Sequence, residues 1–213
     1  MNKLIIILFF IFFFNLNSFS QYQIGVRTGV NLSFQYIENS DFDLEDMNKK
    51  YGFNAALVFN KPIFSFLSIQ PQLIYSQNGV EYAGSLSTYK LSIDYFQFQT
   101  NIKLHSPLFP IYIIGSPYIS YCLSASSQIN TGDLAIVEIS RDNLLFYDFG
   151  ISTGVGMQKG FGVIKLFIEG RYEFGFVDIN GQKNSSGIEI INKNRNIAIY
   201  GGILYKFNRF FPE

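Results

Sequence analysis

Hydrophobic and polar residues alternate along eight stretches of this chain, each of them nine or more residues long. Near the C-terminus, for example, Ile164, Leu166 and Ile168 fall on one face of an extended strand, whereas Lys165 and Glu169 fall on the other. Successive side chains of a β-strand point to opposite faces, so a period of two predicts a strand. The eight predicted strands span residues 22–34, 51–59, 66–77, 93–104, 111–124, 144–157, 163–175 and 195–207.

The connections between these strands alternate strictly between short and long. Residues 60–65, 105–110 and 158–162 are connections of about five or six residues, whereas the other four are polar and about fifteen to nineteen residues long. Each strand also has the roughly ten residues that a tilted strand needs to cross the hydrocarbon layer. Short periplasmic turns and long extracellular loops are typical of outer-membrane barrels. The pattern therefore predicts an all-β fold, an eight-stranded antiparallel transmembrane β-barrel.

In such a barrel the more hydrophobic face of each strand faces lipid and the polar face lines the lumen. In the first strand this rule places Ile24 and Val26 outside and Arg27 and Asn31 inside. We expect a lumen that is polar throughout. Small inward residues of the sixth strand would leave room there for large neighbours; they are Asp148, Gly150, Ser152, Gly154 and Gly156.

Aromatic residues gather at the strand ends. They predict girdles at the two membrane interfaces, although the ordinary strand propensity of aromatic residues would also account for them. The residues concerned are Phe34, Tyr51, Tyr75, Phe96, Tyr147 and Phe174 at the extracellular end, and Tyr22, Phe59, Phe66 and Phe207 at the periplasmic end.

The N-terminus has the features of a secretory signal peptide. Lys3 gives a positive start, residues 4–14 are apolar, and Ser18 and Ser20 are small residues just before the expected cut. The apolar run is too short to span a bilayer as a helix. We therefore predict export to the outer membrane of a Gram-negative cell, with a cleaved signal peptide at 1–20 and an outer-membrane β-barrel domain at 21–213.

Composition excludes several classes of function. Lys plus Arg and Asp plus Glu each total 16, so the chain has no basic excess of the kind that binds nucleic acid. A single cysteine, Cys122, excludes an internal disulfide framework, and we expect it to point inward as a small packing residue. The sequence contains neither a glycine-rich phosphate loop nor a Cys/His metal cluster. No cofactor is therefore predicted, and the expected partners are outer-membrane lipid and lipopolysaccharide.

Charged residues on the predicted lumen face are the main candidate site. Isolated buried ions are costly, so these charges must pair inside a narrow barrel. We expect Arg171 to lie level with Asp148 and Glu169 to meet a lumen cation. Either the network fills the barrel as a salt-bridged plug, or it lines a narrow polar or proton-conducting path. The predicted network comprises Arg27, Asp148, Lys165, Glu169, Arg171 and Glu173.

Three lysines, Lys103, Lys165 and Lys206, are predicted to lie near the periplasmic rim. Their long side chains would extend there toward water, or would contact an acidic periplasmic partner. Another cluster, on the first long loop, consists of acids; the central Gly and closing Glu of a calcium loop are missing. It is predicted to be a solvated loop, with a cation bridge to lipopolysaccharide as the alternative; its members are Glu38, Asp41, Asp43, Glu45 and Asp46.

Catalysis is not expected. The only histidine, His105, lies in a predicted short turn beside Ser106, and no acidic residue is nearby in the sequence. Adjacency in sequence does not make a nucleophile and a base.

Several segments resemble the PorT-like outer-membrane barrel family of Bacteroidota, and the resemblance spans nearly the whole chain after the predicted signal peptide. It implies an eight-stranded barrel, and Pro71 and Pro117 within strands would mark bulges or bends. The segments are LSIQPQLIYSQ at 67–77, GSPY at 115–118, DFG at 148–150, EGRY at 169–172 and GGILYKF at 201–207.

The expected function is a non-enzymatic scaffold that displays loops or docks partners. The PorT-like family includes members implicated in type IX secretion, so the resemblance allows a secretion accessory that contacts a periplasmic or secretion-machinery protein. A narrow polar channel and a soluble lipocalin-like binder of small molecules are the alternatives.

Overall fold

The computed structural model describes residues 22–38, 49–83, 88–131, 133–135, 146–178 and 191–207. They form strands, and their bounds are β1 Gln23–Glu38, β2 Lys50–Pro62, β3 Leu67–Ala83, β4 Thr88–His105, β5 Ile111–Thr131, β6 Asp133–Ala135, β7 Tyr147–Phe161, β8 Ile164–Asp178 and β9 Ile191–Lys206.

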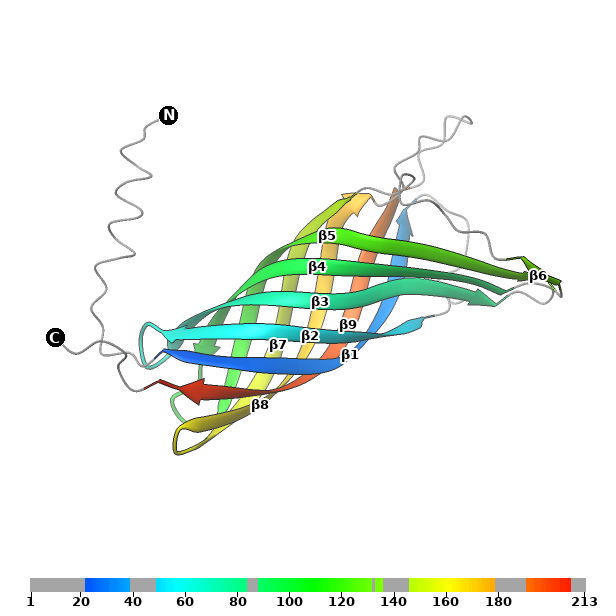
Figure 1. The fold of residues 1–213 in the computed structure, drawn as a ribbon. Helices are drawn as coiled ribbons and strands as arrows, with labels where there is room; N and C mark the ends of the chain where they lie inside the picture. Colours follow the sequence, from blue (N-terminus) through cyan, green and yellow to red (C-terminus); the bar gives the residue numbers. More distant parts are fainter. Residues whose placement is uncertain are drawn as a thin grey trace, which may run out of the picture.

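Eight of these strands close into a barrel (Figure 1). Around the wall the order is β1, β2, β3, β4, β5, β7, β8 and β9, and β9 pairs with β1 to complete the circle. All neighbouring strands are antiparallel, and β6 is a three-residue addition that pairs with the end of β5. The predicted eight-stranded antiparallel barrel is confirmed. Among the described residues there is no helix of the length and hydrophobicity needed to span a membrane.

The strand register fixes the width of the barrel. A line of paired residues that starts at Gln23 on β1 and passes once around the wall returns to β1 at Ser33, ten residues further along. Eight strands with this stagger have a tilt of about 40° and a backbone radius of about 8 Å. A cylinder of this radius is filled by its own side chains, so the interior depends on which residues point inward.

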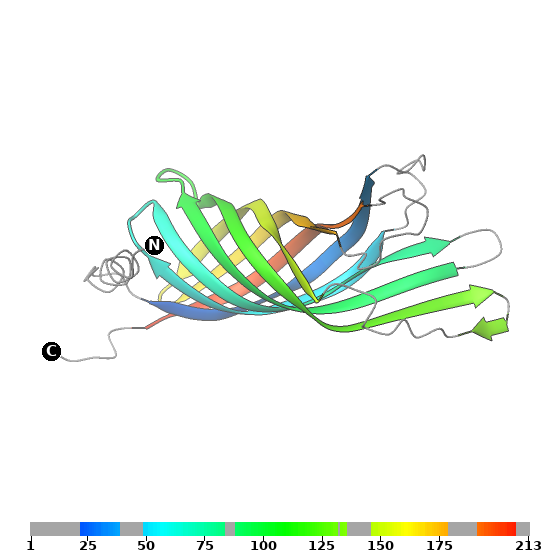
Figure 2. The same cartoon turned by 90° about the horizontal axis from the view of Figure 1, so that it is seen from above.

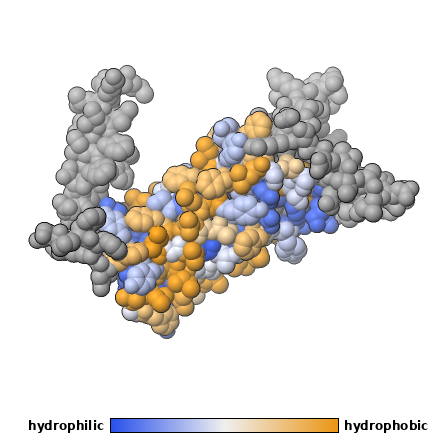
Figure 3. Space-filling model, in the orientation of Figure 1, coloured by the Kyte–Doolittle hydropathy of each residue, from blue (hydrophilic) through white to orange (hydrophobic). Residues whose placement is uncertain are grey.

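The facing predicted from the alternation is confirmed. On β1, Arg27 and Asn31 are buried in the lumen, whereas Val26 and Val30 are more than half exposed on the outer wall. The outer wall is largely hydrophobic over its middle and hydrophilic toward the long-loop end (Figure 3). A water-soluble barrel would bury such residues, so this polarity fits a wall that contacts lipid.

Aromatic side chains border the apolar wall at both ends. Tyr51, Phe96 and Tyr147 are exposed at the long-loop end, and Tyr22 and Phe66 are exposed at the short-turn end. Aromatic rings in these two positions match the girdles of outer-membrane barrels. Because such barrels have short periplasmic turns and long extracellular loops, the short-turn end is the periplasmic end.

Three strands run further at the extracellular end than their alternation predicted. Residues 77–83 of β3, 88–95 of β4 and 122–131 of β5 form an extension, called here the outer ribbon, which projects beyond the ends of the other strands (Figures 1 and 2). The predicted extracellular limits of these strands were residues 77, 93 and 124, close to where the ribbon begins. Residues 78–83, 88–92 and 125–131, which were assigned to long loops, are therefore strand.

Polarity reverses where the outer ribbon begins. Its lumen-side face carries a buried apolar cluster of Val80, Leu91, Ile93, Tyr95 and Cys122, against which Ala125 packs. Its outward face is polar: the Ser124 hydroxyl donates to Asp94 at 3.0 Å, and Lys90 lies 3.9 Å from Glu81. This is the arrangement of a sheet in water, so the reversal marks the outer boundary of the lipid-facing wall.

No bulge lies at Pro71 or Pro117, where the sequence predicted bulges or bends. Pairing of β2 with β3 passes from Val58–Gln72 to Lys61–Ile69 across Pro71 in one unchanged register, and β5 keeps its register with β4 on both sides of Pro117. Each proline lacks an N–H and so removes one hydrogen bond from the ladder. It adds no extra residue to its strand, so the register on its two sides is the same. The register shift between β4 and β5 lies instead at Asp94 and Tyr95.

Gly79 should be required for the outer ribbon. Its φ is +148°, and a Cβ there would lie 2.0 Å from the Leu91 carbonyl oxygen and 2.9 Å from the Lys50 side chain, which crosses β3 to donate to Ser92 at 2.5 Å. We expect Gly79→Ala to lower the free energy of unfolding by about 1–3 kcal/mol. It should also speed amide hydrogen exchange in the parts of β3 and β4 that belong to the outer ribbon. Gly115→Ala, where a Cβ has open space, is the control, and equal effects of the two changes would contradict this explanation.

Candidate functional site

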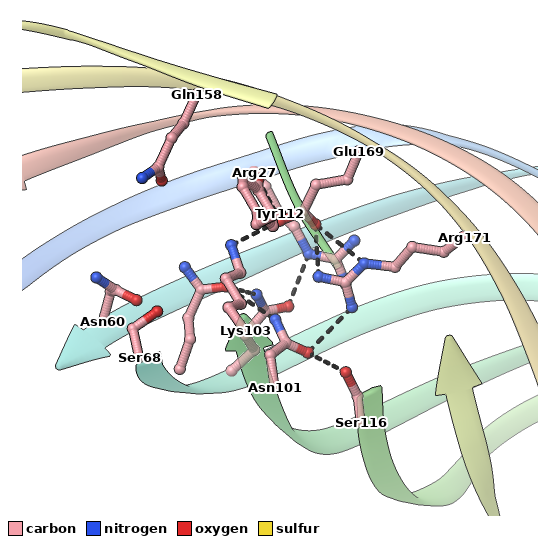
Figure 4. Close-up of polar contacts among 12 residues, drawn as sticks. Arg27, Asn60, Ser68, Asn101, Lys103, Tyr112, Ser116, Gln158, Glu169 and Arg171 are labelled. Atoms are coloured by element: carbon pink, nitrogen blue, oxygen red, sulfur yellow. Dashed lines mark hydrogen bonds and ion pairs between the residues drawn. The ribbon is translucent and has the colours of Figure 1, made fainter. Parts of the chain in front are cut away.

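A group of charged side chains from β1, β4 and β8 lies inside the lumen (Figure 4). Lys103 on β4 lies 2.7 Å from one carboxylate oxygen of Glu169 on β8, and Arg171, also on β8, contacts the other at 2.5 Å. The three side chains are at most 1 % exposed. One carboxylate therefore neutralises part of the charge of two buried cations. One of these cations comes from β4 and the other from β8, the strand that also carries Glu169.

Neutral side chains extend this ion cluster. Tyr112 on β5 donates to Glu169 at 2.9 Å, and Arg171 donates to Asn101 at 3.1 Å. Asn101 also accepts a hydrogen bond of 2.7 Å from Ser116. Hydrogen bonds to each carboxylate and guanidinium offset part of the cost of removing these charges from water.

Arg27 closes the network from the opposite side. Its Nε donates to Gln72 at 2.8 Å, Gln72 donates to Gln70 at 3.0 Å, and Asn101 donates to the same Gln70 oxygen at 2.8 Å. The Arg27 guanidinium lies 3.8 Å from the ring centre of Tyr200. A continuous hydrogen-bonded chain thus joins β1, β3, β4, β5 and β8. We call it the central network, and it comprises Arg27, Gln70, Gln72, Asn101, Lys103, Tyr112, Ser116, Glu169 and Arg171.

The structure brings together three of the six predicted network residues and separates the others. Arg27, Glu169 and Arg171 belong to the central network. Glu173 is buried further up β8 and accepts a hydrogen bond from Asn196 at 3.2 Å. Asp148 accepts one of 2.9 Å from Asn194.

The expectation that Arg171 lies level with Asp148 was wrong. Arg171 pairs with Gly154, six residues along β7 from Asp148, because the register of a tilted barrel cannot be read from one strand. Lys165 is half-buried at the periplasmic end, where it pairs with Gly160.

Lys103 corrects another expectation. It was placed at the periplasmic rim with its side chain extended to water, but it is 1 % exposed and bonded to Glu169. Its ammonium also lies 4.4 Å from the ring centre of Tyr112 and 5.0 Å from that of Phe167. Charge partners on other strands therefore hold Lys103 inside the barrel. The Lys206 ammonium does lie at the rim, where it donates to the Gly162 carbonyl at 3.1 Å.

The alternation predicted a lumen that is polar throughout, and this was wrong. An apolar cluster of Ala56, Val58, Ile74, Phe167 and Leu204 is buried inside the wall. It lies beside the central network, because Ala56 pairs with Arg27 and Ile74 is the next inward residue after Gln72 on β3. The cluster of the outer ribbon lies further toward the extracellular end. These apolar side chains favour a filled interior over an aqueous pore, because water gains few partners from apolar walls.

Sequence reasoning missed the neutral members of the central network. Gln70, Gln72, Asn101 and Ser116 are inward residues of predicted strands, so the alternation contained the signal that they face the lumen. It could not tell which of them meet, because that depends on the stagger of β3, β4 and β5 around the barrel.

Ser68 and His105 form a contact that the sequence did not suggest. The Ser68 hydroxyl lies 2.8 Å from Nε2 of His105, and the Gln158 amide lies 3.4 Å from Nδ1 of the same ring. Among the described residues no carboxylate is hydrogen-bonded to His105, and Ser68 is only 1 % exposed. A nucleophile needs a base that is oriented and made more basic by a partner, and it needs access to substrate. Here the partner of His105 is the neutral Gln158 amide, and Ser68 is buried.

Two predicted features fall outside the described residues: the signal peptide at 1–20 and nearly all of the acidic cluster between Glu38 and Asp46. In the described part of the chain, no group of His, Cys, Asp or Glu side chains is arranged to hold a metal ion. Cys122 points inward and is buried, as predicted.

The fold and its lumen define a small transmembrane β-barrel whose interior is occupied by its own side chains. The chain belongs to the outer membrane protein beta-barrel domain family, whose model matches residues 17–181. This membership assigns the protein to the outer membrane, where its apolar wall contacts lipid. A search of curated proteins gives no match to the sequence.

Several solved outer-membrane proteins are similar in fold. Ail, the attachment invasion locus protein of Yersinia pestis, is 11 % identical, with 88 % of this chain and 99 % of that chain covered and a TM-score of 0.45. Neisserial surface protein A is 14 % identical, with 86 % and 97 % covered and a TM-score of 0.44. OprG of Pseudomonas aeruginosa is 11 % identical, with 89 % and 98 % covered and a TM-score of 0.38.

Proposed function

We propose that this protein is a non-enzymatic outer-membrane scaffold, in which a filled barrel holds the outer ribbon and the surface loops in place for a protein partner. One observation carries the proposal: the central network joins side chains from β1, β3, β4, β5 and β8 across the lumen. A barrel of about 8 Å radius has no room for a second, open path beside them. What remains available for interaction is the surface at either end.

The outer ribbon supports this role. It has its own buried apolar cluster and a polar outward face, so it is built as a water-exposed sheet on a membrane-anchored base. The Ser68–His105 pair supports no catalytic alternative, because Ser68 is buried and His105 has no hydrogen-bonded carboxylate among the described residues.

On its resemblance to the PorT-like family of Bacteroidota, we further propose that the partner belongs to the protein secretion machinery. The resemblance of segments such as residues 67–77 and 169–172 is the support for this step. Crosslinking in native membranes followed by affinity purification of the barrel tests it. A barrel that recovers only lipid and lipopolysaccharide would contradict the proposal.

Conductance in planar bilayers separates this function from a channel. The folded barrel, verified by its heat-modifiable migration on gels, should show no discrete current steps in a recording where a porin of known conductance does. The filled lumen is the reason for this expectation.

A narrow polar channel is the second candidate, and one observation favours it. Side-chain polar atoms of Gln97, Gln99 and Ser152 are buried in the lumen without a hydrogen-bond partner in the described part of the chain. Buried polar atoms need partners, and mobile water or a passing solute would supply them. Discrete steps that change when Arg171 is replaced by alanine would support this candidate and overturn the filled scaffold.

A further inference from the structure

The lipid-facing wall contains a groove that the proposed function does not use. It has a volume of about 750 Å³ and extends over β4, β5, β7, β8 and β9. Its outward-facing walls are Leu104, Ile111, Ile113, Val155, Met157, Ile168 and Ile199, all of them exposed aliphatic or thioether side chains. Tyr112 and Glu169 also border it, although their side chains are buried in the lumen.

A missing side chain at Gly170 opens this groove. Gly170 on β8 faces outward between Val155 of β7 and Ile199 of β9, and a Cβ at Gly170 would meet no atom within 4 Å. Gly201, which pairs with Ile168, has the same open space. Between these glycines the wall is one side chain thinner than its surroundings. An empty hollow in a hydrocarbon layer forfeits van der Waals contacts, so it favours an occupant that fits it.

The extent of the groove along the membrane normal is that of one membrane leaflet. It reaches from Gly170, in the middle of β8, to His105 and Ser106 at the periplasmic end. From Ile164, the first residue of β8, to Gly170 a strand tilted by about 40° rises roughly 15 Å. That is half of a hydrocarbon core of about 30 Å, so the groove spans the periplasmic leaflet and ends at the midplane.

A cation lies at the periplasmic end of the groove. Lys159 follows Met157 by two residues on β7, so its side chain is on the same outward face. It is exposed, and its ammonium lies 5.6 Å from the ring centre of Phe161. The groove is thus apolar along its length and has positive charge at the end where lipid phosphates lie.

We propose that this groove binds one glycerophospholipid of the periplasmic leaflet, with an acyl chain along Ile168, Val155 and Gly170 and the phosphate beside Lys159. Its volume is that of a small-molecule site, and a second barrel, being convex, would leave the hollow unfilled. Lipopolysaccharide occupies the opposite leaflet, so its acyl chains lie at a different level from the groove and its phosphates lie far from Lys159.

Native mass spectrometry of the purified full-length barrel tests this proposal. The probe is palmitoyl-oleoyl-phosphatidylethanolamine, added to delipidated protein in detergent, and the readout is the fraction of barrel that retains one lipid as collision energy rises. We expect one retained lipid on the unaltered protein. Gly170→Leu, which fills the groove, should lower retention about tenfold, and Lys159→Gln should lower it about fivefold.

Two variants serve as matched controls. Ala55→Leu adds three carbons, against four for Gly170→Leu, at an outward position of β2 outside the groove. Lys61→Gln removes the lysine whose ammonium lies 5.4 Å from the ring centre of Tyr22. Both should retain the lipid like the unaltered barrel. The proposal is overturned if the unaltered barrel retains no lipid, if the control variants lose it equally, or if hexa-acylated lipid A displaces the phospholipid at equal concentration.

Discussion

Replacing Glu169 with glutamine is expected to lower the free energy of unfolding by about 3–5 kcal/mol, the cost of removing one partner from a buried ion pair. The carboxylate contacts both Lys103 and Arg171. A neutral amide of the same shape leaves two cations in a lumen from which water cannot easily neutralise them. Urea unfolding of the barrel in lipid vesicles, followed by gel mobility, measures the loss.

Glu173→Gln is the matched control for this prediction. Glu173 is buried one inward position beyond Arg171 on the same strand, but it accepts its hydrogen bond from the neutral amide of Asn196. We expect a loss of about 1 kcal/mol or less. Equal losses for the two variants would show that the ion pairs of Glu169 contribute no more to the free energy of unfolding than the single hydrogen bond of Glu173.

Replacing Ile199 with arginine is expected to destabilise the inserted barrel by about 2–4 kcal/mol. Ile199 is 59 % exposed on the outer wall of β9, beside Gly170 and close to the membrane midplane. A charge at that depth must leave water for hydrocarbon or draw water inward. Unfolding in vesicles and the yield of insertion should both fall.

An arginine placed on the outward face of the outer ribbon should have almost no effect on stability. Gln77 also points outward, from β3, and it pairs with Asp94 on the outer ribbon. Because this face lies in water, Gln77→Arg should change the free energy of unfolding by less than about 1 kcal/mol. A large loss at Gln77 would place the ribbon inside the membrane and refute the assigned boundary.

Alternation along single strands was enough to predict the barrel, its strand number and the facing of its side chains. Ile168 and Glu169 are adjacent in the sequence, and the structure places one on the lipid-facing wall and the other in the lumen, as their polarity required. This works because the period of a strand is a local property and the membrane imposes one polarity on every strand that crosses it.

The same signal failed where the solvent changed. Leu91 and Ile93 belong to strand β4, but their apolar side chains face inward, opposite to the rule for the membrane. Beyond the aromatic girdle water lies outside the sheet, so the rule inverts. The predicted strands ended early because the chain there still alternates, but with the opposite sense.

The chain by itself determined that this protein is a membrane barrel with charges in its interior. Only the tertiary structure decided that Glu169 joins Lys103 and Arg171 and that Asp148 lies far from them. It also decided that the missing side chain at Gly170 leaves a groove in the wall. The reason is the stagger of the strands. A line around the barrel returns ten residues further along β1, and this offset is set by the pairing of all eight strands together.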